Sequence, residues 1–182
     1  MQMYYLAIVL PQHLNIRVLK YKELMLDRFN CKVGLKSPAH ITFIPPYWML
    51  PDKEDALIQR VDSICSEIPN FTILTSNFAS FKPRTIFIDV IVDEKLAWAK
   101  KQVDQYFSED TFFGAKVDKR PFHPHITIAT RDLFKRSFAE AWSLFENETF
   151  TEAFEANGLS TLRHNGRNWD VIHTSAFQSD KI

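Results

Sequence analysis

The chain has 182 residues, and its 22 lysines and arginines are balanced by 22 aspartates and glutamates. A net charge of zero excludes the broad positive field that holds long nucleic acids through counterion release. The glycines are too sparse and too far apart for the glycine-rich loops that bind nucleotide phosphates: Gly34, Gly114, Gly158 and Gly166.

The first half of the sequence predicts strands separated by two long helices. Residues 3–10 form a short apolar run typical of a buried strand. Pro11 then begins a helix, and residues 38–44 predict a strand that ends at Pro45-Pro46. Asp52 is a suitable N-cap for a helix through Ile68. Two further strands are expected after this helix, at residues 71–81 and 85–92, around a turn at Lys82-Pro83-Arg84.

The second half has similar elements in a similar order. Asp93 is expected to cap a long helix, and residues 125–130 predict a strand. Asp132 is expected to cap a helix through about Glu146. The last two strands are expected at residues 150–163 and 168–177, joined by a turn that contains Asn165-Gly166, a strong hairpin signal.

The repeated order indicates an internal duplication. Four matches lie at nearly constant offsets along the chain: His40 with His125, Phe71-Thr72 with Phe150-Thr151, Asn77 with Asn157, and Arg84 with Arg167. We therefore predict one bilobal domain over residues 1–182, with lobes at approximately 1–84 and 85–182. The strand at 85–92 serves in both halves, so the lobes should be interlocked.

The cysteines and the N-terminus predict a cytoplasmic protein. Cys31 and Cys65 have neither the spacing of a zinc site nor that of a disulfide framework, so reduced thiols are expected. The apolar run 4–10 has no basic segment before it, as a signal peptide would have. No apolar run approaches the roughly 18 residues that a membrane-spanning helix needs.

Two tetrapeptides carry the chemistry, His40-Ile41-Thr42-Phe43 and His125-Ile126-Thr127-Ile128. Side chains on a strand alternate between its two faces. Each motif should therefore present an imidazole and a hydroxyl on one face and two apolar side chains to the core. If the lobes are related by a pseudo-twofold axis, the two polar faces meet in one cleft.

Such a histidine pair suits in-line displacement at phosphorus. One imidazole can remove a proton from the attacking oxygen while the other protonates the leaving oxygen, because the ordinary histidine pKa of about 6.5 permits both roles. The hydroxyls of Thr42 and Thr127 can donate to the non-bridging phosphate oxygens. The mechanism requires no metal and no cofactor.

The chain resembles the two-histidine phosphoesterase superfamily, and within it the bacterial 2′-5′ RNA ligases and cyclic phosphodiesterases. The matching segments lie in family order: residues 4–11, 37–47, 78–90 and 123–132. The resemblance implies a bilobal α+β fold, in which two antiparallel sheets flank a central cleft and the helices lie outside. It implies an enzyme that acts, without a metal, on 2′,3′-cyclic phosphate or 2′-5′ phosphodiester ends of RNA or nucleotides.

Carried over to this chain, the resemblance makes His40 and His125 the catalytic pair and Thr42 and Thr127 the phosphate ligands. We first assign His40 as the acid and His125 as the base, although the symmetry allows the reverse. Arg131, just past the second motif, matches a position where the family often has arginine, and it is expected to pair with phosphate.

Other residues near the motifs are candidates for the substrate site. Tyr47, Trp48 and Phe122 could stack on a base. Basic residues at 82–84 and 116–120 could border the cleft. His123 shares a face with His125 if the strand is regular, so these two residues and His40 could instead form a metal site.

Three hypotheses therefore follow from the sequence. The first is a metal-independent phosphoesterase that works as a monomer in the cytoplasm on an RNA or nucleotide with a terminal cyclic phosphate. The second is a non-catalytic module that binds nucleotides or RNA ends on the same fold. The third is a metal hydrolase that uses His40, His123 and His125. The direction of the reaction, ligation or hydrolysis, is left open.

Overall fold

The computed structural model describes residues 1–179 of the chain. In this part of the chain, eight strands form two four-stranded antiparallel sheets, with the orders β2-β1-β7-β8 and β5-β4-β3-β6. The strands are β1 (Gln2–Val9), β2 (His40–Met49), β3 (Phe71–Phe81), β4 (Thr85–Val90), β5 (His125–Ala129), β6 (Ala153–Ala156), β7 (Gly158–His164) and β8 (Trp169–Ala176). The expected α+β fold with two antiparallel sheets is confirmed.

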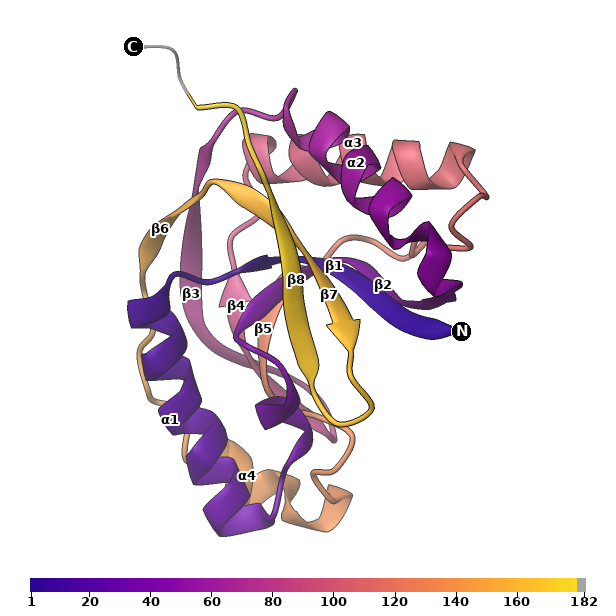
Figure 1. Cartoon of the computed structure of the whole chain (residues 1–182). Helices are drawn as coiled ribbons and strands as arrows, with labels where there is room; N and C mark the ends of the chain where they lie inside the picture. Colours follow the sequence, from indigo (N-terminus) through magenta and orange to yellow (C-terminus); the bar gives the residue numbers. More distant parts are fainter. Residues whose placement is uncertain (180–182) are drawn as a thin grey trace.

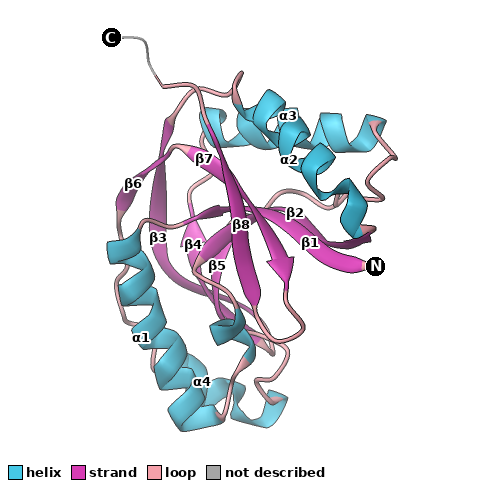
Figure 2. Ribbon diagram, viewed as in Figure 1, coloured by secondary structure: helices cyan, strands magenta, loops and turns pink. Residues whose placement is uncertain are grey.

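The helices lie outside the sheets, at two ends of the molecule (Figure 1). Helices α2 and α3 lie together at one end, and α1 and α4 lie together at the other (Figure 2). Their bounds are α1 (Gln12–Phe29), α2 (Glu54–Cys65), α3 (Glu94–Glu109) and α4 (Phe138–Ser143), with short 3-10 helices η1 (Val33–Lys36), η2 (Pro51–Lys53) and η3 (Lys135–Ser137). No helix among residues 1–179 has the length and apolar character needed to cross a membrane.

The strand order shows how the two halves of the chain interlock. Strand β3, from the first half, pairs with β4, and β7, from the second half, pairs with β1. The long helices also cross over, since α1 contacts β5 and α3 contacts β2. We infer that the fold is a duplication in which each lobe exchanges its last strands with the other. The boundary near residue 84 then falls in the β3–β4 turn.

Strand β1 is buried on both faces. Tyr4, Leu6 and Ile8 are fully or almost fully buried in the main core, to which most helices and strands contribute. Tyr5 and Ala7, on the opposite face, form a smaller cluster with Leu162 of β7. A large apolar side chain fully removed from water contributes about 1.5–3 kcal/mol, so this central strand fixes the sheet from both sides.

The sequence placed the end of one strand wrongly. Strand β2 does not stop before Pro45-Pro46 but continues to Met49, with a shift in its register against β1 between Ile44 and Tyr47. Proline has no backbone N–H to donate, and β2 tolerates two prolines because it is an edge strand with one unpaired side.

The expected helix caps have mixed outcomes. The carboxylate of Asp93 accepts a hydrogen bond from the backbone N–H of Leu96 at 2.8 Å and caps α3, as predicted. Asp52 lies within η2, and Lys53 precedes α2, which ends at Cys65 rather than Ile68. Asp132 caps no helix that follows it. Its carboxylate instead accepts from the N–H groups of Lys32 and Val33, at the start of η1.

The last strands also differ from expectation. Residues 150–163 do not form one strand, because β6 pairs with β3 in one sheet and β7 pairs with β1 in the other. Asn157 is the residue between them. The final hairpin is confirmed, with the N–H of Asn165 bonded to the carbonyl of Asn168 and Gly166 at a φ of 93°.

Candidate active site

The two His-x-Thr motifs lie at the start of β2 and of β5, which contact each other between the sheets. In each motif the apolar residues are buried, while the histidine and threonine are partly exposed. This is the alternation that a strand with one core face requires.

Both strands also carry a bulge directly after the threonine. On β2, Thr42 pairs with Ala7 but Ile44 pairs with Leu6, so Phe43 is the extra residue. On β5, Thr127 pairs with Phe87 but Ala129 pairs with Ile86, so Ile128 is the extra residue. Bulges turn the strand locally and are common beside active sites. Their equivalent positions support the duplication.

The two histidines are held by equivalent hydrogen bonds. The Nδ1 atom of His40 lies 2.7 Å from the carbonyl oxygen of Pro38, and that of His125 lies 2.8 Å from the carbonyl oxygen of His123. A carbonyl only accepts, so each Nδ1 must donate its proton. Each Nε2 is therefore the atom left to accept or donate a proton in a reaction.

A cleft of about 740 Å³ opens beside the motifs. It is bordered by residues of β2, by the ends of β3 and β4, by α3, and by the segment that leads into β5: Thr42, Phe43, Pro45, Pro46, Phe81, Thr85, Lys100, Asp104, Asp118, Arg120, Pro121, Phe122, His123, Pro124, His125, Thr127 and Thr130. Both motif threonines and one motif histidine thus line a single cleft.

His40 lies on the same side of β2 as Thr42, where burial lowers its pKa to about 4. The positive charge of Lys22 and the nearby His125 lower this pKa further, against the effect of the bond to Pro38. The ring of Tyr5 packs on the imidazole of His40, with centroids 5.0 Å apart. His40 is therefore neutral at pH 7 and close to His125.

His125 is influenced by a different set of neighbours. Burial also lowers its pKa, with a smaller contribution from His123, while the hydrogen bond to the carbonyl of His123 and the charge of Asp89 raise it. The carboxylate of Asp89 lies 3.0 Å from Nε2 of His123. The ring of Phe87 packs on His125 with centroids 5.0 Å apart, as Tyr5 packs on His40.

The structure brings only one of the predicted aromatic residues to the cleft. Phe122 lines it, packs against Phe43 with centroids 6.0 Å apart, and lies under the ammonium group of Lys100. Tyr47 is buried in the core. Trp48 is 56% exposed but does not border the cleft.

The expected basic residues are also only partly at the cleft. Arg131 is exposed and outside it, because the bulge in β5 directs Thr130 to the cleft instead. Of the basic residues at 82–84 and 116–120, Arg120 alone borders the cleft, paired with Asp118. The hydroxyl of Thr130 lies 3.4 Å from the hydroxyl of Thr85. Nothing in the sequence indicated this pair, except that Thr130 follows the second motif closely and Thr85 follows the turn at 82–84.

The wall beyond Phe122 carries an ion pair that sequence reasoning missed, in which the lysine is buried and the aspartate is partly exposed. Lys100 on α3 is 6% exposed and bonded to Asp104, one helical turn further on. Burial raises the pKa of Asp104. The only sign of this pair in the sequence was the spacing of four residues between Lys100 and Asp104. That spacing is also common on solvent-exposed helices, so it does not single out a pair at a cleft.

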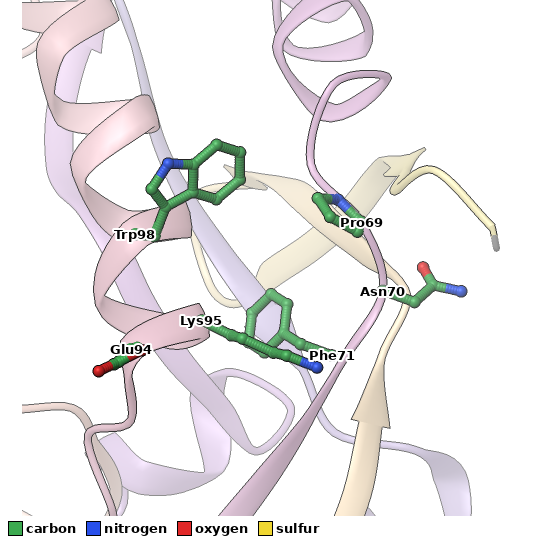
Figure 3. Close-up of a pocket in the computed structure, with 6 residues that line it drawn as sticks. All are labelled: Pro69, Asn70, Phe71, Glu94, Lys95 and Trp98. Carbon is green, nitrogen blue, oxygen red and sulfur yellow. The ribbon is translucent and has the colours of Figure 1, made fainter.

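A second cavity, of about 440 Å³, lies between the start of α3 and the segment that leads into β3 (Figure 3). Its lining is Pro69, Asn70, Phe71, Glu94, Lys95 and Trp98, and the side chain of Asn70 points away from the other residues. None of the predicted site residues borders it.

Across residues 1–179, no three His, Cys, Asp or Glu side chains are grouped closely enough to hold a metal ion. The alternative metal site of His40, His123 and His125 is therefore not among the groups that the described residues form. Cys31 and Cys65 are both buried free thiols.

Strands of both sheets border the cleft, and the two His-x-Thr strands, β2 and β5, contact each other beside it. Residues 10–168 match the family model of the 2′-5′ RNA ligase superfamily. The chain belongs to this superfamily and is a phosphoesterase-type enzyme.

Solved structures share the fold at low sequence identity. TT0787 of Thermus thermophilus is 13% identical with a TM-score of 0.69, and the match covers 100% of both chains. E. coli LigT complexed with 3′-AMP is 17% identical with a TM-score of 0.65, over 97% of this chain and 98% of that one. The MHV ns2 PDE domain is 15% identical with a TM-score of 0.54, over 89% of this chain and 99% of that one. No curated protein matches the sequence.

Proposed function

We propose that the protein acts on 2′,3′-cyclic phosphate or 2′-5′ phosphodiester ends of RNA or nucleotides, as a cyclic phosphodiesterase, a reversible 2′-5′ RNA ligase, or both. The observation that carries the proposal is the matched geometry of the histidines. Each donates its Nδ1 proton to the carbonyl two residues earlier, so each keeps Nε2 for proton transfer.

The proposed mechanism uses this pair as an acid and a base. One imidazole removes a proton from the attacking oxygen as it bonds to phosphorus, and the other protonates the oxygen whose bond to phosphorus breaks. Cleavage and ligation of one phosphodiester share the same transition state, so the same residues serve both directions. The side chains alone supply the proton transfers.

Thr42 and Thr127 are proposed to bind the phosphate group. One comes from each motif strand, and both line the cleft. Their hydroxyls can donate to the two non-bridging oxygens, where negative charge increases in the transition state. Thr85 and Thr130 extend this hydroxyl surface along the second lobe.

The substrate class is supported by the cleft and by the structural neighbours. Structures of E. coli LigT are described as complexed with 3′-AMP, with NADP+ and with ATP. In this chain, Phe122 offers an aromatic surface on which a base can stack. The protein needs only a local anion site, so a balanced net charge is compatible with a nucleotide substrate. We expect it to act as a monomer, because one chain supplies the lining of the cleft. Two free, buried thiols are compatible with the cytoplasm, where we expect it to work.

The test is turnover of a nucleoside 2′,3′-cyclic phosphate and of a 2′-5′-linked dinucleotide in EDTA. Wild type should turn over at least one of them, and His40→Ala and His125→Ala should each lose activity by about 10²–10⁴-fold. His13→Ala is the matched control, because His13 is exposed on α1. Activity that survives in either motif variant contradicts the proposal. Binding without turnover favours a non-catalytic module, and loss of turnover in EDTA favours a metal hydrolase.

A further inference from the structure

We propose that the hairpin of β7 and β8 carries a second nucleobase-binding site, formed by Trp169, His164 and Arg167. Its occupant is the nucleoside on the far side of the scissile phosphate from the one that stacks on Phe122. The inference rests on the proposed function, because it assigns a site to another part of the same substrate.

The pairing of the strands places the end of this hairpin on the face of the sheet that carries the first motif. Thr42 of β2 pairs with Ala7 of β1, and Ala7 pairs with Ser160 of β7, so these three residues share a face. His164 is four residues beyond Ser160 on β7 and therefore has the same orientation. Its partner across the hairpin is Trp169. Both aromatic side chains thus lie on the same side of the sheet as Thr42.

A continuous row of aromatic contacts joins this pair to His40. The ring of Tyr5 packs on His40 with centroids 5.0 Å apart, and Trp169 packs nearly perpendicular to Tyr5 with centroids 4.6 Å apart. His164 packs against Trp169 with centroids 4.9 Å apart. Tyr5 is buried, whereas the outer two rings are partly exposed and available to a base. Only the ring of Tyr5 separates the indole from the catalytic imidazole, a distance that one nucleoside can bridge.

The second lobe indicates that this part of the sheet borders the cleft. Tyr5 and Leu162 pair two residues before the position on β1 that faces the first motif threonine. Thr85 and Phe81 pair at the same position relative to the second motif threonine, and both border the cleft. The duplication therefore assigns Tyr5 and Leu162, with Trp169 packed against them, to the corresponding wall on the first lobe.

The turn of the hairpin adds a positive charge next to the two rings. Arg167 is exposed, and within residues 1–179 its side chain forms no ion pair. Its backbone N–H donates to the side-chain oxygen of Asn165 at 2.9 Å. The N–H of Gly166 donates to Nδ1 of His164 at 3.2 Å, which leaves Nε2 of this ring as the donor. Local hydrogen bonds thus hold the turn that presents the cation.

A nucleoside fits this chemistry better than an apolar partner does. Every base has a flat face that stacks on aromatic rings, and arginine adds to such a surface by stacking or by pairing with phosphate. The second nucleoside of the substrate is also covalently attached to the phosphate bound at the motif threonines. It is therefore present at high effective concentration, so stacking on Trp169 needs no separate binding event.

The test compares the binding of two ligands by titration calorimetry. One is a 2′-5′-linked diadenosine monophosphate, and the other is adenosine 2′,3′-cyclic phosphate, which has a single base. Both are measured in a His125→Ala background, so that neither is consumed. Trp169→Leu should raise the Kd of the dinucleotide by roughly 5- to 150-fold and leave the Kd of the mononucleotide unchanged. Trp169→Phe, which keeps an aromatic ring, should recover most of this loss.

Arg167→Gln provides a second variant, because an exposed turn residue can be replaced without disturbing the core. It should weaken the dinucleotide several-fold and spare the mononucleotide. The matched controls are Trp98→Leu, which removes a tryptophan that is 44% exposed on α3 and outside the cleft, and Arg28→Gln, which removes an exposed arginine on α1.

The proposal is overturned if either variant weakens the dinucleotide no more than its control does. It is also overturned if Trp169→Leu weakens both ligands equally, because that result would show a displacement of Tyr5 and His40 and not the loss of a second base. Binding in the inactive background does not depend on the reaction. A wild type that turns over neither ligand would therefore refute the proposed function, while the four dissociation constants would still decide whether the second site exists.

Discussion

His40 and His125 are fixed by the same local hydrogen bond, from Nδ1 to the carbonyl oxygen two residues earlier, at 2.7 Å and 2.8 Å. The bond sets the tautomer of each ring and keeps Nε2 free. The surroundings then differ, with Lys22 near the ring of His40 and both His123 and Asp89 near the ring of His125. The repeated motif thus provides two equivalent imidazoles, and residues outside it make them unequal.

The motif threonines should affect the chemical step more than binding. Thr42→Val and Thr127→Val keep the side-chain shape but remove the hydroxyl that would donate to a phosphate oxygen. We expect each to lower kcat by about 10²–10³-fold, the usual cost of losing one donor to a developing oxyanion. Steady-state kinetics on the cyclic phosphate measure this.

Thr72→Val is the matched control, because Thr72 is exposed on β3 and away from the cleft. A kcat for either motif variant close to that of this control would show that the hydroxyls do not bind the phosphate in the transition state.

Binding of the substrate's base should depend on Phe122 and not on Trp48. Phe122 lines the cleft, whereas Trp48 does not. Stacking of a base on an aromatic ring is worth about 1–3 kcal/mol, so Phe122→Leu should raise KM by roughly 5- to 150-fold. Trp48→Leu removes a larger aromatic ring than Phe122→Leu does, but it should leave KM unchanged. The reverse pattern in kinetics with a nucleoside cyclic phosphate would place the base elsewhere.

The sequence could predict the features that depend on near neighbours. Alternation along a strand places Ile41 and Ile126 in the core, and a carboxylate three residues before Leu96 caps α3. The turn at Asn165-Gly166 is likewise a local property of the backbone. These predictions needed no knowledge of the rest of the chain.

The features that were missed depend on partners far away in sequence. Pro45-Pro46 lies within a strand only because β2 has a free edge, which is a property of the sheet. Arg131 is outside the cleft because the bulge at Ile128 shifts the alternation of faces by one residue. The carboxylate of Asp132 bonds to Lys32 and Val33, in the other half of the chain.

Acid should destabilise the fold through His40. The pKa of this histidine is about 4 in the folded state, against an ordinary value of 6.5. As the pH falls below about 6.5, His40 becomes protonated in the unfolded chain but stays neutral in the folded chain, so unfolding becomes more favourable. Between about pH 7 and pH 4 the free energy of unfolding should fall by about 3 kcal/mol from this group.

Urea unfolding of wild type and His40→Gln at several pH values across this range measures this contribution. The variant lacks the group, so its stability should fall less over this range, and the two curves should converge or cross as the pH decreases. Curves that stay parallel would show that His40 titrates near its ordinary value in the folded protein.

The carboxylate of Asp132 should stabilise the segment that orients His40. Its Oδ2 atom accepts from the N–H groups of Lys32 at 2.5 Å and Val33 at 2.8 Å, at the start of η1. Helix η1 ends at Lys36, shortly before Pro38, the residue whose carbonyl holds the ring of His40. Asp132→Ala leaves two backbone donors without this acceptor, and it should lower the free energy of unfolding by about 1–2 kcal/mol.

The matched control is Asp27→Ala, because Asp27 is exposed on α1. If these hydrogen bonds of Asp132 also orient the ring of His40, Asp132→Ala should lower kcat several-fold under conditions where the protein is fully folded. Asp132→Asn keeps one acceptor oxygen, so it should recover part of the loss of stability and part of the loss of kcat. Equal unfolding midpoints for Asp132→Ala and Asp27→Ala would contradict the stabilising role. A loss of stability with unchanged kcat would limit the carboxylate to holding the two halves of the chain together, because the carbonyl of Pro38 would then keep its position without it.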